Sequence, residues 1–155
     1  MKNVIILLLV YIICAAVTCE PKERDNCHTA IRFSNNTDKK LYVRDVYISN
    51  PFDISRLSNT VFVSYVVNAG EQNNRRAISF AGCFEHDFER ADTVFVYIFD
   101  ASVIENTPWE VVARDYLVLK RYDLTLSDLQ RLDWRVTYPP TEAMKDIKQY
   151  PTYGE

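Results

Sequence analysis

The densest cluster of reactive side chains in the sequence is GCFEHDFERAD, residues 82–92. It places Cys83 three residues before His86, and elsewhere Cys27 is followed directly by His28. Two thiolates and two imidazoles could form a zinc site. The spacing argues against one, because zinc ligands usually come in C-x-x-C or H-x-x-x-H pairs and adjacent ligands rarely reach the same ion. We therefore predict no metal and no other cofactor.

The same stretch could instead hold a general base. His86 has acidic residues on both sides that could orient its ring, namely Glu85, Asp87 and Glu89. A nucleophile is missing, because neither Ser79 nor Ser102 lies in a nucleophile-elbow pattern. Acidic residues near the start of a strand most often form a solvated turn. We therefore expect a charged turn here.

Asp100 is a second candidate for catalysis, because it ends TVFVYIFD (residues 93–100), the most apolar segment after the N-terminal run. A carboxyl group half buried at this point would have a raised pKa and could serve a hydrolase. The alternative is an aspartate whose side chain accepts hydrogen bonds from the backbone of the following turn. The charged residues Lys120, Arg121 and Asp123 are expected to form a solvated strand edge, or to include basic partners of such an acid.

Residues 1–18 have the pattern of a secretory signal peptide. Lys2 provides a basic start, an uncharged apolar run extends from Val4 to Val17, and small residues precede Cys19. The apolar run is shorter than the ~20 residues of a membrane-spanning helix. The sequence Ala16-Val17-Thr18-Cys19 resembles the lipobox of bacterial lipoproteins, in which the cysteine is acylated. The alternative is ordinary cleavage at the same bond, which would release a secreted soluble protein.

The number of cysteines favours lipidation of Cys19. Cys14 would leave with the signal peptide, so an ordinary secreted product would keep Cys19, Cys27 and Cys83, an odd number in an oxidising compartment. Acylation of Cys19 leaves an even pair. We therefore predict lipid attachment at Cys19, which would anchor the protein in a membrane, and a disulfide bond between Cys27 and Cys83.

Composition indicates one compact, β-rich domain. The chain has 155 residues, with 3 glycines, 10 tyrosines and 8 phenylalanines, which is typical of an aromatic core. Its formal net charge is −3, and it lacks the clustered basic excess of a nucleic-acid-binding protein. We expect a tether over residues 19–28, a single domain over 29–140 and a peripheral tail over 141–155.

Alternating apolar residues and turn signals predict mainly strands. We expect strands at residues 29–35 and 40–48, joined as a hairpin, and further strands at 60–68, 76–80, 93–100, 116–122 and 134–139. Two short helices are expected in connections, one started by a capping box at Thr107 and one capped by Thr125. These elements predict an antiparallel β-sandwich, immunoglobulin-like in general shape. The alternative is an α+β fold with a mixed sheet.

The C-terminal third of the chain resembles a known family. The run from Thr93 to Pro140, with IFDA, LKRYDLTLSDL and a final W-x-x-TYPP, is similar to a family of small uncharacterised cell-envelope lipoproteins of Bacteroides-type gut bacteria. The resemblance implies an envelope lipoprotein, in agreement with the lipobox. It implies no activity and transfers no functional residue.

The function expected from these features is non-catalytic. We predict a protein of the bacterial cell envelope, anchored by lipid at a periplasmic or surface-exposed face, that acts as a binding or accessory module for a protein or glycan partner. Aromatic side chains outside the core could stack on sugar rings or anchor a protein, and they are expected to include Tyr138, Tyr150 and Tyr153. The alternative is a small envelope hydrolase that uses Asp100 or His86.

Overall fold

The computed structural model describes residues 27–47, 50–57, 66–79 and 81–154 of the chain. Its strands form two sheets, one of three strands in the order β4–β1–β7 and one of five strands in the order β3–β2–β5–β6–β8. The strand bounds are β1 (Ala30–Asn35), β2 (Leu41–Val46), β3 (Val66–Val67), β4 (Asn74–Ser79), β5 (Val94–Asp100), β6 (Lys120–Leu124), β7 (Arg135–Tyr138) and β8 (Lys148–Tyr150). The connections contain the helices α2 (Phe84–Phe88), α3 (Ala101–Asn106), α4 (Trp109–Arg114) and α5 (Leu126–Arg131) and the 3-10 turn η2 (Glu142–Met144).

Strand β5 lies at the centre of the five-stranded sheet and separates two cores. Since successive side chains of a strand point to opposite faces, Val96 and Ile98 pack into one core while Tyr97 and Phe99 pack into the other. The first core is shared with the three-stranded sheet, through residues that include Ile31, Phe33 and Val136. The second is covered by the loop after β2 and by α3 and α4, through residues that include Ile54, Ala101 and Val112. The prediction of a mainly β, sandwich-like fold with a buried central strand is confirmed.

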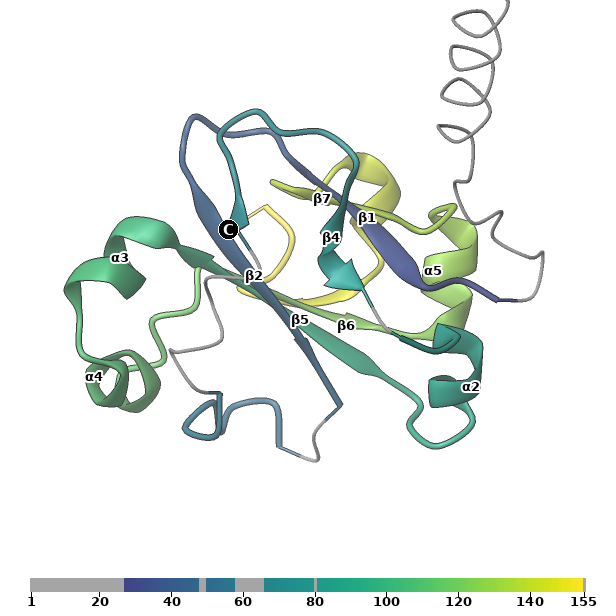
Figure 1. Cartoon of the computed structure of the whole chain (residues 1–155), viewed down its shortest axis with the longest axis horizontal. Coiled ribbons are helices and arrows are strands. Elements are labelled where there is room, and N and C mark those ends of the chain that lie inside the picture. The colour runs from purple at the N-terminus through teal and green to yellow at the C-terminus, as the bar shows by residue number, and fades with distance from the viewer. Residues whose placement is uncertain (1–26, 48–49, 58–65, 80, 155) are drawn as a thin grey trace, which may run out of the picture.

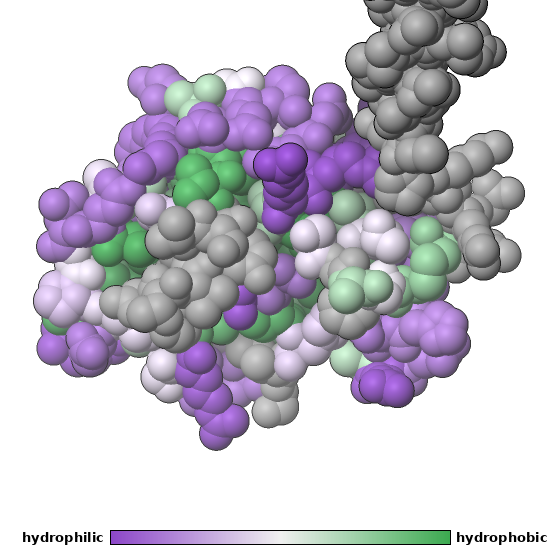
Figure 2. All heavy atoms as spheres, in the orientation of Figure 1, coloured by the Kyte–Doolittle hydropathy of each residue, from purple (hydrophilic) through white to green (hydrophobic). Residues whose placement is uncertain are grey.

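The helices gather at opposite ends of the molecule (Figure 1), with α3 and α4 at one end and α2 and α5 at the other. Figure 2 shows the face of the molecule that is viewed in Figure 1, with hydrophilic residues around most of its rim and hydrophobic residues further in. No helix in the described ranges is long and apolar enough to cross a membrane. The described chain begins at Cys27, which is bonded to the residue that precedes α2. Helices α3 and α4 therefore lie at the end remote from this entry point.

Local capping explains one of the two predicted helix starts. The Thr125 hydroxyl accepts from the Asp128 N–H at 3.2 Å, and Asp128 Oδ2 accepts from the Thr125 N–H at 3.0 Å. The predicted cap of α5 is therefore confirmed. The capping box predicted at Thr107 is wrong, because this residue ends α3 in an extended conformation and α4 begins at Trp109 without a side-chain cap.

Strands β1 and β2 do not pair with each other, so the predicted hairpin is wrong. β1 pairs antiparallel with β4 and parallel with β7, which makes the small sheet mixed rather than antiparallel. The turn after β1 is built around Asn35, whose buried side-chain amide donates to the carbonyls of Lys39 at 2.6 Å and Asn68 at 2.9 Å. Its Oδ1 accepts from the Thr37 N–H at 3.0 Å. The predicted turn is present, but it carries the chain from one sheet to the other.

The segment after Pro140 belongs to the fold, which corrects the expectation of a peripheral tail over residues 141–155. Met144 and Ile147 are buried in the core that the two sheets share. β8 pairs with β6 and completes the five-stranded sheet. The sequence pattern is weak here because a short edge strand points few side chains into the core. The domain therefore extends well beyond residue 140.

Three further segments differ from expectation. The turn predicted at residues 82–92 contains α2, and α3 follows β5 directly, so the connections contain more helices than the two expected. The strand predicted at 116–122 starts only at Lys120, because Tyr116 has a left-handed backbone with φ 49° that a strand cannot continue through. Most of the strand predicted at 60–68 lies outside the described residues, and its last part is β3.

A substitution at Ile147 tests whether the C-terminal segment is part of the core. We expect Ile147→Ala to lower the free energy of unfolding by about 2–5 kcal/mol, because it removes a buried side chain from a packed core. The control Lys145→Ala removes an exposed side chain of the same segment and should cost less than about 0.5 kcal/mol. Urea-induced unfolding measures both variants. If both lowered the free energy of unfolding by equally small amounts, residues 141–155 would be a peripheral tail as first expected.

Candidate functional site

The cluster of reactive side chains around Cys83 contains a disulfide bond. Cys27 and Cys83 are joined, with their Cα atoms 4.8 Å apart, as the number of cysteines predicts. The bond links the start of the described chain to the start of α2 across a sequence separation of 56. In the chain-entropy model, a cross-link over such a loop stabilises the folded state by at most about 4 kcal/mol. The cluster therefore has a structural role.

The histidine that the fold engages is His28 rather than His86. The Nδ1 of His28 lies 2.6 Å from Glu85 Oε1, its backbone N–H donates to Oε2 at 2.9 Å, and its ring stacks on Trp134 with centroids 4.0 Å apart. Burial alone would raise the pKa of Glu85, but the hydrogen bonds from His28 lower it below its ordinary value. His86 is exposed on α2. In the described part of the chain, no group of three or more His, Cys, Asp or Glu residues could hold a metal ion.

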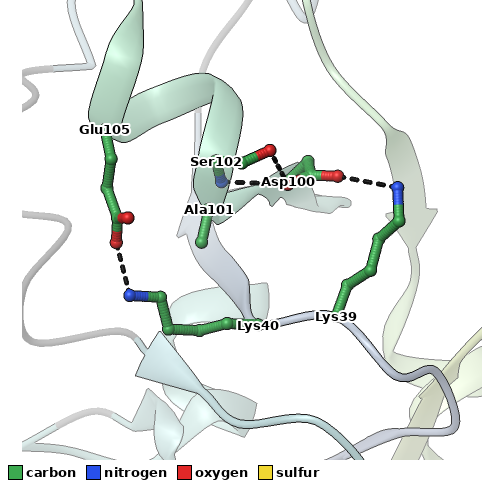
Figure 3. A pocket seen from close by; sticks show the side chains of 6 residues that line it. All are labelled: Lys39, Lys40, Asp100, Ala101, Ser102 and Glu105. Carbon is green, nitrogen blue, oxygen red and sulfur yellow. Dashed lines mark hydrogen bonds and ion pairs between the residues drawn. The ribbon is translucent and has the colours of Figure 1, made fainter.

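Asp100 lies in an open pocket of about 280 Å³ at the start of α3 (Figure 3). The pocket is lined by residues of β5, of α3 and of the segment before β2. They are Lys39, Lys40, Asp100, Ala101, Ser102 and Glu105. Asp100 Oδ2 accepts from Lys39 Nζ at 2.9 Å, while Oδ1 accepts from the Ser102 N–H at 2.9 Å and the Ser102 hydroxyl at 2.6 Å. A second ion pair joins Lys40 to Glu105. Two ion pairs thus connect the walls of the pocket.

The charges of this pocket satisfy one another. The pKa of Asp100 is held below its ordinary value, first by the hydrogen bond from Ser102 and then by Lys39. The pKa of Glu105 is lowered by Lys40, and that of Lys39 is raised by Asp100. Both carboxylates are therefore held in their ionised form at neutral pH. The raised pKa expected for Asp100 is therefore wrong, and its hydrogen bonds to the following turn are confirmed.

The charged residues of β6 lie in the interior, although they were expected to form a solvated edge or to include basic partners of Asp100. Arg121 and Asp123 are 3% and 4% exposed, and the rings of Phe52 and Tyr150 lie over the Arg121 guanidinium. Arg121 Nε donates to Asp123 Oδ1 at 2.7 Å and Nη2 donates to Oδ2 at 3.3 Å. Its Nη1 donates to the Tyr116 hydroxyl at 2.8 Å and to the Pro51 carbonyl at 3.1 Å. Lys120 is also buried and donates to two backbone carbonyls near the C-terminus.

Three aromatic rings, which we call the aromatic group, lie around the Arg121 guanidinium. They are Phe52, Tyr116 and Tyr150, with ring centroids 5.4 Å (Phe52–Tyr116), 5.5 Å (Tyr116–Tyr150) and 5.7 Å (Phe52–Tyr150) apart. The guanidinium carbon lies 4.4 Å from the centroid of Phe52. Phe52 is 55% exposed and Tyr150 is 43% exposed. The aromatic group is therefore held by the buried guanidinium and open to solvent.

Some features of the aromatic group and of the ion pair beneath it could be predicted from the sequence. Arg121 and Asp123 are two residues apart, so a strand places them on one face where they can pair. Tyr150 and Tyr153 are exposed as predicted, whereas Tyr138 packs against the core as part of β7. Phe52 lies in a loop without apolar periodicity. Its place beside Arg121 depends on contacts between distant parts of the chain.

Substitutions at Asp100 distinguish a helix cap from a catalytic acid. Asp100→Ala should lower the free energy of unfolding by about 1 kcal/mol at neutral pH, because it removes the cap of α3. Asp100→Asn should retain most of that stability, since asparagine caps equally well. The folded-state pKa of Asp100 is lowered, so the contribution of its charge is present above the unfolded-state pKa and is lost as the pH falls through the folded-state pKa.

Urea-induced unfolding at a series of acidic pH values measures this effect. The stability advantage of the wild-type protein over Asp100→Ala should shrink as the pH falls. An advantage that grows in acid, or an Asp100→Asn variant as unstable as Asp100→Ala, would contradict the assignment of Asp100 as an ionised cap.

A double-mutant cycle tests the buried ion pair. Arg121→Met and Asp123→Leu should each lower the free energy of unfolding by about 3–5 kcal/mol. Asp123→Leu leaves the Arg121 guanidinium buried without its carboxylate, and Arg121→Met leaves the buried Asp123 carboxylate dependent on the exposed Lys148 ammonium. The double variant should be less destabilised than either single variant. Lys148→Met is the control, since this exposed ammonium lies 3.3 Å from Asp123 and its loss should cost about 0–1 kcal/mol. Additive losses in denaturant-induced unfolding would show that the pair is not coupled.

Comparison of the chain with models of protein families, with curated proteins and with solved structures finds no match. The resemblance of the segment from Thr93 to Pro140 to envelope lipoproteins therefore stays a prediction. Two features of the structure bear on the function of the protein. The charged side chains of the candidate sites are paired with one another, and the aromatic group is open to solvent.

Proposed function

We propose that this chain is an exported, lipid-anchored protein of the bacterial cell envelope that acts as a non-catalytic binding or accessory module. The observation that carries the proposal is the aromatic group of Phe52, Tyr116 and Tyr150, which is open to solvent and fixed on a buried ion pair. The partner bound through this group is a protein or a glycan.

The aromatic group has the properties of a binding surface. Aromatic side chains supply much of the binding energy at interfaces, and rigid side chains lose little conformational entropy when they bind. A buried ion pair such as Arg121–Asp123 adds little net stability, but it fixes the orientation of the rings around it. The Pro51 carbonyl accepts from the hydroxyls of Tyr97 and Tyr116 and from Arg121 at 2.7, 3.1 and 3.1 Å. These bonds hold the loop that carries Phe52.

A small envelope hydrolase that uses Asp100 or His86 has less support. Asp100 is paired with Lys39 and caps α3, and both contacts favour its ionised form. His86 is exposed on α2, at the other end of the molecule from α3 (Figure 1). The two candidate residues are therefore far from each other, and neither has the surroundings of a general acid or of an activated base.

The chemistry of the N-terminal region supports export and anchoring. A disulfide bond such as Cys27–Cys83 persists in an oxidising compartment. Cys19 lies outside the described residues, and its acylation is proposed from the lipobox-like residues that precede it. The first described residue, Cys27, is bonded to the residue that precedes α2. Helices α3 and α4 lie at the other end of the molecule from α2 (Figure 1).

Fractionation of bacteria that produce the full-length chain tests the anchoring. We expect wild-type protein in the membrane fraction and Cys19→Ala in the soluble fraction, because the variant lacks the residue that would be acylated. Cys14→Ala is the matched control, since it lies within the apolar run and should leave the protein in the membrane fraction. Wild-type protein in the soluble fraction, or an unmodified Cys19 thiol in mass spectrometry, would disprove the lipid anchor.

An activity screen tests the choice between binding and catalysis. The purified, disulfide-bonded protein is incubated with chromogenic esters, amides and glycosides, beside its Asp100→Asn and His86→Gln variants. We expect no turnover that depends on either residue. Turnover that one of these substitutions abolishes, while the fold stays intact by circular dichroism, would establish the hydrolase instead.

A further inference from the structure

A second pocket lies beside α4, between this helix and the loop after β2. It has a volume of about 500 Å³, within the range of small-ligand sites. Its lining residues are Asp53, Ser55, Trp109, Glu110, Ala113 and Arg114, and none of them lines the Asp100 pocket or belongs to the aromatic group. Helix α4 lies at the end of the molecule remote from the disulfide (Figure 1). We propose that this pocket is a second binding site, separate from the aromatic group, and that it binds one sugar ring of a neutral glycan, an inference that rests on the proposed role of the chain as a binding module.

Trp109 provides the apolar surface of the pocket. Its indole N–H donates to the Ser55 carbonyl at 3.4 Å, and Phe99 packs edge-on against its ring with centroids 6.0 Å apart and planes at 67°. These contacts hold the indole between the loop and the second core. The C–H groups of a sugar ring form an apolar face that packs on an aromatic ring, while its hydroxyls remain free to form hydrogen bonds. An indole fixed in a pocket wall therefore suits this ligand.

The polar side chains of the pocket offer both acceptors and donors. Asp53 Oδ1 accepts from the Ser55 N–H at 3.2 Å and from its hydroxyl at 2.6 Å, and the bond from this hydroxyl lowers the pKa of Asp53. Arg114 is held by Asp115 through two hydrogen bonds of 2.8 Å. Carboxylates only accept and guanidinium groups only donate, whereas sugar hydroxyls do both. A polyhydroxy ligand can therefore match Asp53, Glu110 and Arg114 together.

The charge of the pocket distinguishes a neutral sugar from other small ligands. Asp53 and Glu110 line it, and the guanidinium of Arg114 is already paired with Asp115. An anionic ligand such as a phosphate or a uronic acid would be repelled by this excess of negative charge. A cationic amine would be attracted by the two carboxylates, and a quaternary ammonium ligand would need a cage of several aromatic rings. Among the described lining residues, Trp109 provides a single ring, so a neutral glycan fits better.

Binding measurements on the purified, disulfide-bonded protein test this site. A panel of neutral and acidic oligosaccharides is titrated by calorimetry, with choline and spermidine as amine probes. We expect at least one neutral oligosaccharide to bind, and Trp109→Ala to weaken its affinity by about tenfold or more. Ala113→Leu narrows the pocket without removing the indole and should also weaken binding, which covers the case in which Trp109→Ala does not fold. Leu117→Ala is the matched control, because it removes an exposed apolar side chain that does not line the pocket, and it should change the affinity by less than about twofold.

Three outcomes would overturn the site. The first is that no neutral oligosaccharide binds at millimolar concentration, and the second is that only the amines or the acidic sugars bind. The third is a glycan whose affinity falls in Tyr150→Ala but not in Trp109→Ala or Ala113→Leu. This last result would leave the proposed binding function intact and move the contact to the aromatic group. In the first two cases the proposed function is judged separately, by the fractionation and activity experiments.

Discussion

The buried ion pair between Arg121 and Asp123 is the constraint on which much of this structure depends. Charges in the interior of a sheet must find their hydrogen bonds within the protein, because an unpaired buried charge is very unfavourable. Arg121 meets this requirement with Asp123, the Tyr116 hydroxyl and the Pro51 carbonyl. The loop after β2, the residues after α4 and the Tyr150 side chain of strand β8 all lie around the Arg121 guanidinium.

The same arrangement explains which chemistry is left at the surface. Phe52 and Tyr150 lie over the Arg121 guanidinium, with their centroids 4.4 and 5.9 Å from its carbon, and their outer parts face solvent. Asp100, a catalytic candidate, caps the start of α3, and Glu85, which was considered as a residue that orients His86, instead binds His28 beside the disulfide. The exposed rings of the aromatic group offer packing surface to a ligand, and the proposed binding function rests on this surface.

The candidate site could be predicted where its chemistry is local or follows from counting. Cys27 and Cys83 can be paired from the sequence, because they are the two cysteines that would remain if Cys14 left with a signal peptide and Cys19 were acylated. The hydrogen bonds of Asp100 to Ser102 follow from its position before a turn, but its partner Lys39 lies 61 residues away. The Ser102 hydroxyl lowers the pKa of Asp100 most, and Lys39 lowers it further. The first cause could be anticipated from the sequence, whereas the second depends on the fold.

The sequence by itself determined the features that near neighbours control, such as the two-faced alternation of β5, the Thr125 cap of α5 and the turn at Asn35. Only the tertiary structure decided which strands pair. Strand β1 pairs with β7 rather than with β2, and β8 pairs with β6. The reason is that strand partners are selected by packing between distant segments, whereas the pattern of one strand specifies only which of its faces is buried. The aromatic group and the Trp109 pocket belong to this second class, because both form where the loop after β2 meets segments more than fifty residues away.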